Sequence, residues 1–350
     1  MALSLRSWVA NEGRKNLLLV VWLAVNVVVF WRTFVLYSSG PQYYYLHQML
    51  GMGVCVSRAS ASLLNLNCCL VLLPMCRSIL TCLRGTLKVW ARGGRRLLDQ
   101  SRNFHSACGT AICVFSVVHV SAHLVNAVSF SVKFSDEFPS LNMAQYRGQD
   151  PRIIILTTVP GVTGVLLVLI LFLMFTASTP CIRVGSYEIF WFTHNLFIVF
   201  YIILTVHVVG GALKYQTNLD THTPGCLPAN HSGFTADTST NQERELEGRQ
   251  QREPICGEEA RFQSHFPETW LWVLAPLCLY CTERMCRYIR SWTPCTIVTV
   301  ARHPCQVIEL RMLKDGFKAK PGQVRCVCVC VCLYVCVCVC VCVCLYVCVC

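Results

Sequence analysis

The sequence predicts an all-α membrane protein, a bundle of six transmembrane helices followed by two short strands and a low-complexity tail. Three observations predict this. Of the 350 residues, 54% are hydrophobic and only 14% are charged, whereas soluble domains carry about 25% charged residues. The apolar residues gather into stretches of about 20 residues, the length that crosses the hydrocarbon core of a bilayer. Basic residues gather at alternate connections between these stretches.

Each apolar stretch is expected to form a helix, because backbone polar groups in lipid must find hydrogen-bond partners within the segment. The first stretch is too long for the apolar region of a signal peptide, and no small-residue cleavage pattern follows it, so we expect it to stay in the protein. The six expected spans are Asn16–Leu36, Met49–Leu73, His105–Phe130, Ile153–Phe175, Tyr187–Gly210 and Trp270–Ile289.

The basic connections predict the orientation of the bundle. If the spans alternate in direction, the basic residues fall on one side, which the positive-inside rule makes the cytosol. Both termini are then expected in the cytosol, and the formal net charge of +12 reflects topology rather than a nucleic-acid partner. The residues are Arg6, Arg14, Lys15, Arg77, Arg84, Lys88, Arg92, Arg95, Arg96, Arg102, Arg183, Arg284, Arg287 and Arg290.

The last outer connection, residues 212–268, is long and polar. It contains Asn230-His231-Ser232, an acceptor pattern for N-glycosylation that also arises by chance. Cys226 and Cys256 lie in the same connection and would be able to pair in an oxidising compartment. Spacing alone does not establish the connectivity, so the paired and unpaired states both stay open.

The chain changes character after the sixth span. Thr296–Val300 and Val307–Met312 alternate in hydrophobicity, as two strands do. Cys326–Cys350 is a nearly pure Val-Cys alternation, which we interpret as a translated simple repeat; a metal-binding or palmitoylated tail is the alternative. The expected domains are therefore residues 1–290, 291–323 and 324–350.

Four histidines at two depths are the informative feature of the membrane part, because ionisable residues inside spans are costly and usually functional. His105 and His119 are fourteen residues apart, which places both on one side of a helix, about 21 Å apart along its axis. His194 and His207 lie at matching depths on a span that runs in the same direction. We therefore expect His105 to face His194 and His119 to face His207.

The thirteen-residue spacing of His194 and His207 fits less well. An ideal helix would point these two rings about 140° apart. A π-bulge, a helix tilt or a different rotamer is needed to make up the difference.

A single histidine in a span would be explained by a hydrogen bond between helices. Four at two matched depths favour axial ligation of two stacked haem groups, whereas zinc ligands would gather around one point. Iron with two histidine ligands has no open position for oxygen. The expected chemistry is therefore outer-sphere transfer of one electron, with superoxide as the product.

Several segments along the chain are typical of one known family. They are Tyr43-Tyr-Tyr45, Ala59-Ser-Ala61, Leu64-Asn-Leu-Asn67, Leu72-Leu-Pro-Met-Cys-Arg77, Leu83-Arg-Gly85, Phe104-His105, His119-Val-Ser-Ala-His123-Leu-Val-Asn126, Ser186-Tyr-Glu-Ile-Phe-Trp-Phe-Thr-His194-Asn-Leu-Phe197, Trp270-Leu-Trp-Val273 and Tyr280-Cys-Thr-Glu-Arg284. In these segments the chain resembles the phagocyte-type NADPH oxidases, the flavocytochrome b heavy chains, over roughly residues 8–323. The resemblance implies that the two expected histidine pairs are the axial ligands of two haem b groups.

The resemblance also points to Arg58 and His123 as residues near the outer haem and the oxygen site. Positive charge there would stabilise superoxide as it forms. The alternative for Arg58 is snorkelling to the membrane interface, and the alternative for His123 is a hydrogen bond between helices.

In the resembled family NADPH gives a hydride to FAD, which feeds the inner haem. Thr296–Gln323 looks like only the first strands of the family's flavin-binding barrel, so the FAD and NADPH sites are expected to be largely missing here. The resemblance implies molecular oxygen, a small membrane companion subunit and cytosolic activator proteins as partners, and the plasma membrane as the location. Two alternatives stay open: a truncated, non-catalytic haem protein that competes for oxidase partners, and a transmembrane ferric reductase.

Overall fold

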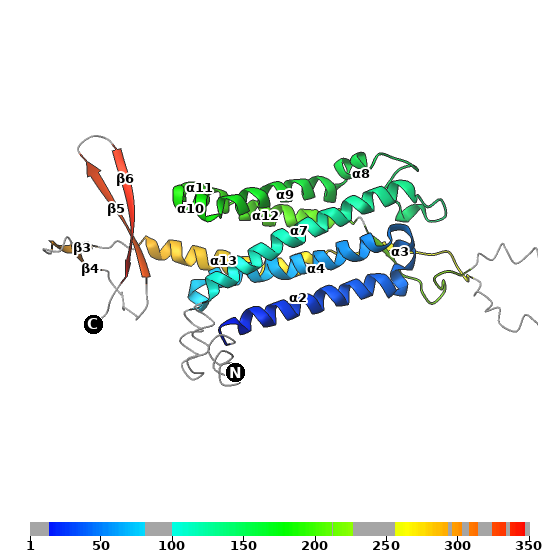
Figure 1. The fold of residues 1–350 in the computed structure, drawn as a ribbon, viewed down its shortest axis with the longest axis horizontal. Coiled ribbons are helices and arrows are strands. Elements are labelled where there is room, and N and C mark those ends of the chain that lie inside the picture. The colour runs from blue at the N-terminus through cyan, green and yellow to red at the C-terminus, as the bar shows by residue number, and fades with distance from the viewer. Residues whose placement is uncertain are drawn as a thin grey trace, which may run out of the picture. The chain divides into compact units, whose positions relative to one another are not determined.

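The computed structural model describes residues 14–80, 100–211, 213–226 and 256–292, and the strand segments 296–302, 308–313, 324–333 and 337–346. The chain divides into two compact units, Met1–Glu283 and Arg284–Cys350. The described part of the first unit is mainly helical, as predicted, and Figure 1 shows its long helices side by side. Its elements are α2 (Arg14–Ser39), η2 (Pro41–Tyr43), α3 (Tyr44–Leu50), α4 (Met52–Leu72), η3 (Leu73–Met75), α7 (Ser101–Val132), η5 (Pro139–Leu141), α8 (Pro151–Thr157), α9 (Val159–Ala177), α10 (Pro180–Gly185), α11 (Tyr187–His194), α12 (Phe197–His207), η6 (Val208–Gly210), β1 (Lys214–Gln216), β2 (Phe262–Ser264) and most of α13 (Thr269–Ser291).

The membrane character of the chain follows from its helices. The sixth expected span is present as α13, but Glu283, Arg284 and Arg287 enter its second half, so its uninterrupted apolar part is short. Many large apolar side chains of the other long helices are exposed at the surface of the bundle, as lipid contact requires. The chain is an integral membrane protein. Within the described residues, the helices long and apolar enough to cross a bilayer are Leu17–Ser39, Met52–Met75, Ser101–Val132, Val159–Ala177 and Tyr187–Gly210.

Two of the expected spans begin differently from the prediction, each for a local reason. The second begins at Met52, because Gly51 takes a positive φ of 61° that ends α3 and separates it from α4, a conformation that glycine adopts at little cost. The fourth is broken at Thr158 into α8 and α9. Pro160, in the first turn of α9, has no N–H to bond to Leu156 and its ring would clash with that carbonyl.

The helices of the first unit pack in two groups. α4 lies between α2 and α7, while α9 packs against α11 and α12. α4 and α7 approach closely at Gly53, where an added Cβ would collide with the side chain of Asn126, so a small residue at the interface sets the packing distance. Buried residues from several helices form a shared core: Cys68, Leu72, Cys76, Ile112, Leu167, Phe200, Tyr201, Val273 and Tyr280.

One end of the bundle carries α3 and a short antiparallel sheet of β1 and β2, in which Tyr215 pairs with Gln263. We call the described parts of this outer connection, residues 213–226 and 256–268, the cap, and this end the cap end. A second core lies beneath the cap and is formed by Tyr37, Tyr43, Leu46, Met49, Leu50, Val54, Cys55, Phe130, Leu141, Ala144, Ile154 and Leu213.

Among its described residues, the second unit contains the end of α13 and two antiparallel strand pairs. β3 (Thr296–Arg302) pairs with β4 (Ile308–Leu313), close to the strands that the sequence predicts. The Val-Cys repeat forms β5 (Val324–Leu333) and β6 (Val337–Tyr346), in which valine lies opposite valine and cysteine opposite cysteine over most of the ladder.

Several predicted features lie outside the described residues. These are the glycosylation pattern at Asn230 and most of the basic connection between the second and third spans, residues 81–99.

Candidate functional site

Two pairs of histidine rings face each other between α7 and the α11–α12 segment. His105 and His119 lie on α7, while His194 and His207 are the last residues of α11 and α12. The ring centroids of His105 and His194 are 6.1 Å apart, and those of His119 and His207 are 6.4 Å apart. The structure therefore brings together the residues that the sequence pairs by depth.

Both separations suit a metal ion held between two imidazoles. A histidine nitrogen binds a metal at about 2 Å and lies about 1.1 Å from its ring centre, so two histidines on opposite sides of one ion have centroids about 6 Å apart. Among the described residues, no hydrogen bond joins the two rings of either pair. The two pairs lie at separate levels of α7, so the four rings do not converge on one point.

The histidines of α7 are fixed by backbone carbonyls of α4. His105 Nδ1 lies 2.8 Å from the oxygen of Val71, and His119 Nδ1 lies 3.0 Å from the oxygen of Ser57. A carbonyl oxygen only accepts, so Nδ1 carries the hydrogen in both rings and Nε2 carries the lone pair. Metal-binding histidines almost always donate their second nitrogen in this way.

The partner histidines are fixed by hydroxyl groups of α9 and its end. His207 Nδ1 lies 2.9 Å from Thr163 Oγ1, and His194 Nδ1 lies 3.3 Å from Ser178 Oγ. Each hydroxyl already donates to a carbonyl of its own segment, Thr163 to Val159 and Ser178 to Met174, at 2.6 Å. The hydroxyl oxygens therefore accept from Nδ1–H, and all four rings share one tautomer with Nε2 free to coordinate.

The thirteen-residue spacing is accommodated by a break in the helix rather than by the π-bulge that the sequence allowed. Asn195 and Leu196 separate α11 from α12 with ψ angles of −12° and −10°. Leu196 N bonds to the carbonyl of Thr193, and Ile198 N to that of Asn195, which is the three-residue spacing of a 3₁₀ turn. A 3₁₀ turn advances about 120° per residue instead of about 100°, so it rotates His207 toward the direction of His194.

Arg58 and His123 lie on the cap side of the His119–His207 pair. The His123 ring centroid is 4.5 Å from that of His119, one turn farther along α7. Arg58 Nε donates to the hydroxyl of Tyr37 on α2 at 3.0 Å, and its guanidinium carbon lies 5.4 Å from the Tyr37 ring centroid. Arg58 thus has a protein partner inside the bundle, while His123 makes a ring contact along its own helix.

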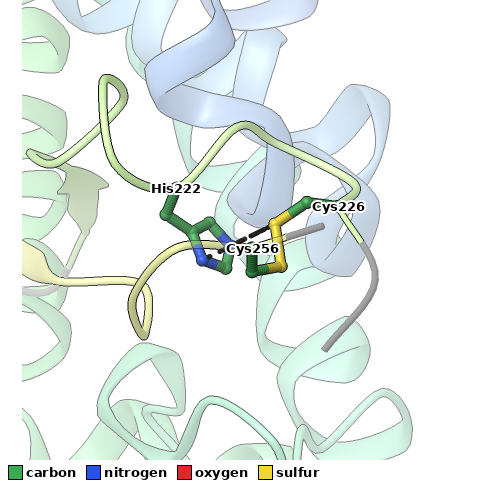
Figure 2. Close-up of side chains that lie close together, drawn as sticks. All are labelled: His222, Cys226 and Cys256. Atoms are coloured by element: carbon green, nitrogen blue, oxygen red, sulfur yellow. Dashed lines mark hydrogen bonds between the residues drawn. A yellow bond between two sulfur atoms is a disulfide. The ribbon is translucent and has the colours of Figure 1, made fainter. Parts of the chain in front are cut away.

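The cap is closed by a disulfide between Cys226 and Cys256, whose Cα atoms are 5.2 Å apart. Figure 2 shows His222 beside this disulfide. The three residues have donor atoms within 4.8 Å of one another, which is the spacing of a metal site. Because the two sulfur atoms are bonded to each other, they are not thiolate ligands, and the cluster is a structural closure of the cap.

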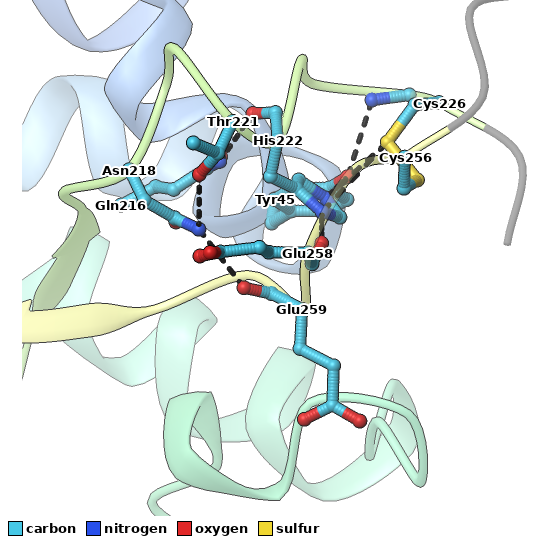
Figure 3. Close-up of a disulfide and its surroundings, with 10 residues drawn as sticks. Tyr45, Gln216, Asn218, Thr221, His222, Cys226, Cys256, Glu258 and Glu259 are labelled. Carbon is cyan, nitrogen blue, oxygen red and sulfur yellow. Dashed lines mark hydrogen bonds between the residues drawn. A yellow bond between two sulfur atoms is a disulfide. The ribbon is translucent and has the colours of Figure 1, made fainter. Parts of the chain in front are cut away.

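His222 ties the cap to α3 through a continuous chain of hydrogen bonds (Figure 3). Its Nδ1 lies 2.7 Å from the carbonyl oxygen of Glu258, and its Nε2 lies 2.7 Å from the hydroxyl of Tyr45. Nδ1 therefore donates and Nε2 accepts, while the Tyr45 oxygen accepts from the N–H of Gly225. Gln216 Nε2 donates to the His222 carbonyl. Only three-dimensional contacts reveal this arrangement, because no sequence pattern indicates it.

A known protein family matches the part of the chain that contains most of these site residues. Residues 58–205 match the family described as "Ferric reductase like transmembrane component". This range begins at Arg58 and contains His105, His119 and His194, while His207 lies two residues beyond it.

NADPH oxidase 4 of Homo sapiens is 57% identical to this chain over 344 residues, which cover 92% of the chain and 58% of that relative. The chain belongs to the NADPH oxidase family. NADPH oxidase 1 of Mus musculus is 34% identical over 341 residues, with 92% of the chain and 55% of the relative covered. NADPH oxidase 3 of Homo sapiens is 33% identical over 333 residues, with 90% and 56% covered. The chain thus spans less than three fifths of the length of these NADPH oxidases.

Proposed function

We propose that the chain holds two haem b groups, one between His105 and His194 and one between His119 and His207, and transfers electrons across a membrane to molecular oxygen. The observation that carries the proposal is the shared geometry of the four rings. Each ring has its Nδ1 hydrogen-bonded to another segment, and in each pair the rings face each other at about the distance of two ligands on one metal ion. A bound haem supplies reversible one-electron chemistry at its iron.

The residues around the second pair decide the product. With a haem bound, His119 and His207 would both be ligands of its iron and would leave no ligand position for oxygen; the haem would supply single electrons, and superoxide would be the product. Arg58 and His123 lie on the cap side of this pair. The positive charge of Arg58 and the ring N–H of His123 stabilise the anion as it forms.

The cap end faces the outside of the cell and both termini face the cytosol, with the plasma membrane as the location. The basic connections support this orientation. The disulfide between Cys226 and Cys256 supports it independently, because such bonds persist in oxidising compartments. Asn230, in the same connection, is the proposed glycosylation site.

Electrons enter at the end opposite the cap, from NADPH by way of FAD. The names of the relatives, NADPH oxidases 4, 1 and 3, support this donor. The family's FAD and NADPH sites are expected to lie largely outside the part of the relatives that the chain spans. A small membrane companion subunit and cytosolic activator proteins are the proposed protein partners.

The test is oxidation of the reduced chain by oxygen. Membranes that contain the full chain are reduced with dithionite, mixed with oxygenated buffer, and followed by haem absorbance and by superoxide-dismutase-sensitive reduction of a superoxide probe. We expect oxygen-dependent reoxidation with superoxide formation, lost in His119→Ala and slowed about 10-fold or more in Arg58→Gln. His47→Gln is the matched control, because His47 lies on α3 outside both pairs.

Two outcomes would contradict the proposal. If ferric citrate oxidises the reduced chain much faster than oxygen does, and no superoxide forms, the chain is a ferric reductase. If the spectrum and the reoxidation rate are the same in His119→Ala and His47→Gln, the pair His119–His207 holds no haem.

A further inference from the structure

His265, a residue of the cap, contacts Tyr37, which is the hydrogen-bond partner of Arg58. His265 follows directly after β2. Its Nε2 lies 2.7 Å from the hydroxyl oxygen of Tyr43 and 3.3 Å from that of Tyr37. Tyr37 is also the residue that accepts the hydrogen bond of Arg58 Nε at 3.0 Å. A cap residue, a tyrosine of α2 and an arginine of α4 therefore form one chain of polar contacts.

The surroundings of this chain are aromatic and closed. Tyr37 is 4% exposed and Tyr43 is 2% exposed. Their rings stack with centroids 4.1 Å apart, and the His265 ring stacks on Tyr43 at 5.5 Å. The ring of Tyr215 in β1 lies 4.7 Å from that of His265. Polar groups in such an enclosure depend on one another for hydrogen bonds, because little water reaches them.

The direction of each hydrogen bond follows from the donors. A guanidinium only donates, so the Tyr37 oxygen accepts from Arg58 and keeps its own hydrogen for another acceptor. Burial, with the nearby charge of Arg58, lowers the pKa of His265 to about 4, so the ring is neutral at physiological pH. The Tyr37 hydroxyl therefore donates to Nε2 of neutral His265 at 3.3 Å, which assigns the ring hydrogen to Nδ1, and Nε2 also lies 2.7 Å from the Tyr43 hydroxyl. The Tyr37 hydroxyl is thereby oriented with its oxygen toward Arg58.

Arg58 links this chain to the His119–His207 pair, because it lies close enough to interact electrostatically with His119 and with the neighbouring His123. Its side chain has many rotamers, and a charge that stabilises a forming anion must be held in place before the reaction. One hydrogen bond to Tyr37 and the contact with the Tyr37 ring hold it.

We propose that His265 is a positioning residue: through the Tyr37 hydroxyl, it holds the Arg58 guanidinium at the oxygen site. The inference rests on the proposed function, which makes Arg58 the cation beside the forming superoxide. It assigns a role to a cap residue that touches neither histidine pair. The competing explanation is that His265 only fills space between Tyr43 and Tyr215.

Two substitutions separate these explanations. His265→Phe keeps an aromatic ring of similar size but removes the acceptor, whereas His265→Gln places an amide near the position of Nε2 and restores an acceptor. Ser264→Ala is the matched control, because Ser264 is the exposed neighbour of His265 in β2. Tyr37→Phe removes the intermediate hydroxyl while keeping the ring on which Arg58 lies.

The readouts are the oxygen reoxidation rate of the dithionite-reduced full chain and the midpoint potential of the outer haem in an anaerobic titration. We expect His265→Phe and Tyr37→Phe each to slow reoxidation about 10-fold, and the double variant to be no slower than either alone, since both act on one hydrogen-bond chain. Both variants should shift the midpoint potential of the outer haem in the same direction as Arg58→Gln does and leave that of the inner haem unchanged. His265→Gln and Ser264→Ala should shift neither potential.

The inference is overturned if His265→Phe equals Ser264→Ala in rate and potential, or if His265→Gln is as impaired as His265→Phe, which would make ring packing the role. The inference is also overturned if the double variant slows reoxidation by the product of the factors measured for Tyr37→Phe and His265→Phe alone. If His265→Phe does not fold, the test compares Tyr37→Phe, which should be slow, with His265→Gln, which should keep the wild-type rate. If wild-type chain is not reoxidised by oxygen, the proposed function fails, while the potential shifts still decide the role of His265.

Discussion

His105 Nδ1 on α7 lies 2.8 Å from the carbonyl oxygen of Val71 near the end of α4. This contact turns the His105 ring so that its other nitrogen is directed across the bundle to His194. The other three histidines have contacts at Nδ1 too, so the orientation of each ring depends on a hydrogen-bond partner from another segment.

Thr163→Val tests one of these contacts. The change keeps the side-chain shape but removes the hydroxyl that accepts from His207 Nδ1, so the ring loses its fixed tautomer and orientation. We expect outer-haem affinity to fall about 10- to 100-fold, measured as haem retained during detergent washing, with the inner haem unaffected. Thr176→Val is the control, since it deletes a hydroxyl on the same helix that bonds only to its own helix carbonyls. Equal haem retention in the two variants would contradict the account.

Asn67→Leu tests the polar contact between α2 and α4. Asn67 is fully buried; it accepts from Trp22 Nε1 at 3.0 Å and donates to Asn26 Oδ1 at 2.7 Å. Leucine would leave both partners without their bond, at about 1–3 kcal/mol for each buried group. We expect Asn67→Leu to have a lower Tm in detergent than the wild type. The double variant Asn67→Leu and Asn26→Leu should recover part of this loss. A double variant less stable than Asn67→Leu alone would speak against this pairing.

Acid should destabilise the cap through His265. Its pKa is lowered to about 4 in the folded chain by burial and by the charge of Arg58, compared with about 6.5 when unfolded. Between these values the unfolded state binds more protons, so stability is complete above about pH 6.5 and is lost as the pH falls toward about 4. As the pH is lowered from 7.5 to 4.5, the Tm of the wild type should fall more than the Tm of His265→Gln. A pH-independent difference would exclude His265 as the group.

Reduction of the Cys226–Cys256 disulfide should loosen the cap. The bond closes a loop with a sequence separation of 30 residues, which stabilises the folded state by about 3–4 kcal/mol in the chain-entropy model. We expect Cys256→Ser to lower the Tm and to speed proteolysis of the cap, with no further effect of dithiothreitol. Cys181→Ser, at an exposed free thiol, is the control. Unchanged proteolysis in Cys256→Ser would show that hydrogen bonds alone hold the cap.

The sequence predicted the first five spans closely because each is a long apolar segment, whose pattern is local. It also paired the histidines by depth, because fourteen residues nearly complete four helical turns. It did not predict the 3₁₀ turn at Asn195, which carries no glycine or proline signal. The contact of His105 with Val71 involves a backbone carbonyl, which any residue provides, so no sequence pattern could reveal it. His265 was missed because it lies in a polar connection and its partners Tyr37 and Tyr43 are more than 200 residues away in the sequence.

A reduced-minus-oxidised absorbance spectrum of membranes that contain this chain would show whether each of the two facing histidine pairs holds a haem. With dithionite, we expect low-spin b-type bands, halved in His105→Ala and in His119→Ala and unchanged in His47→Gln. A folded chain with no haem bands, or bands indifferent to both alanine substitutions, would contradict the assignment of His105 with His194 and of His119 with His207.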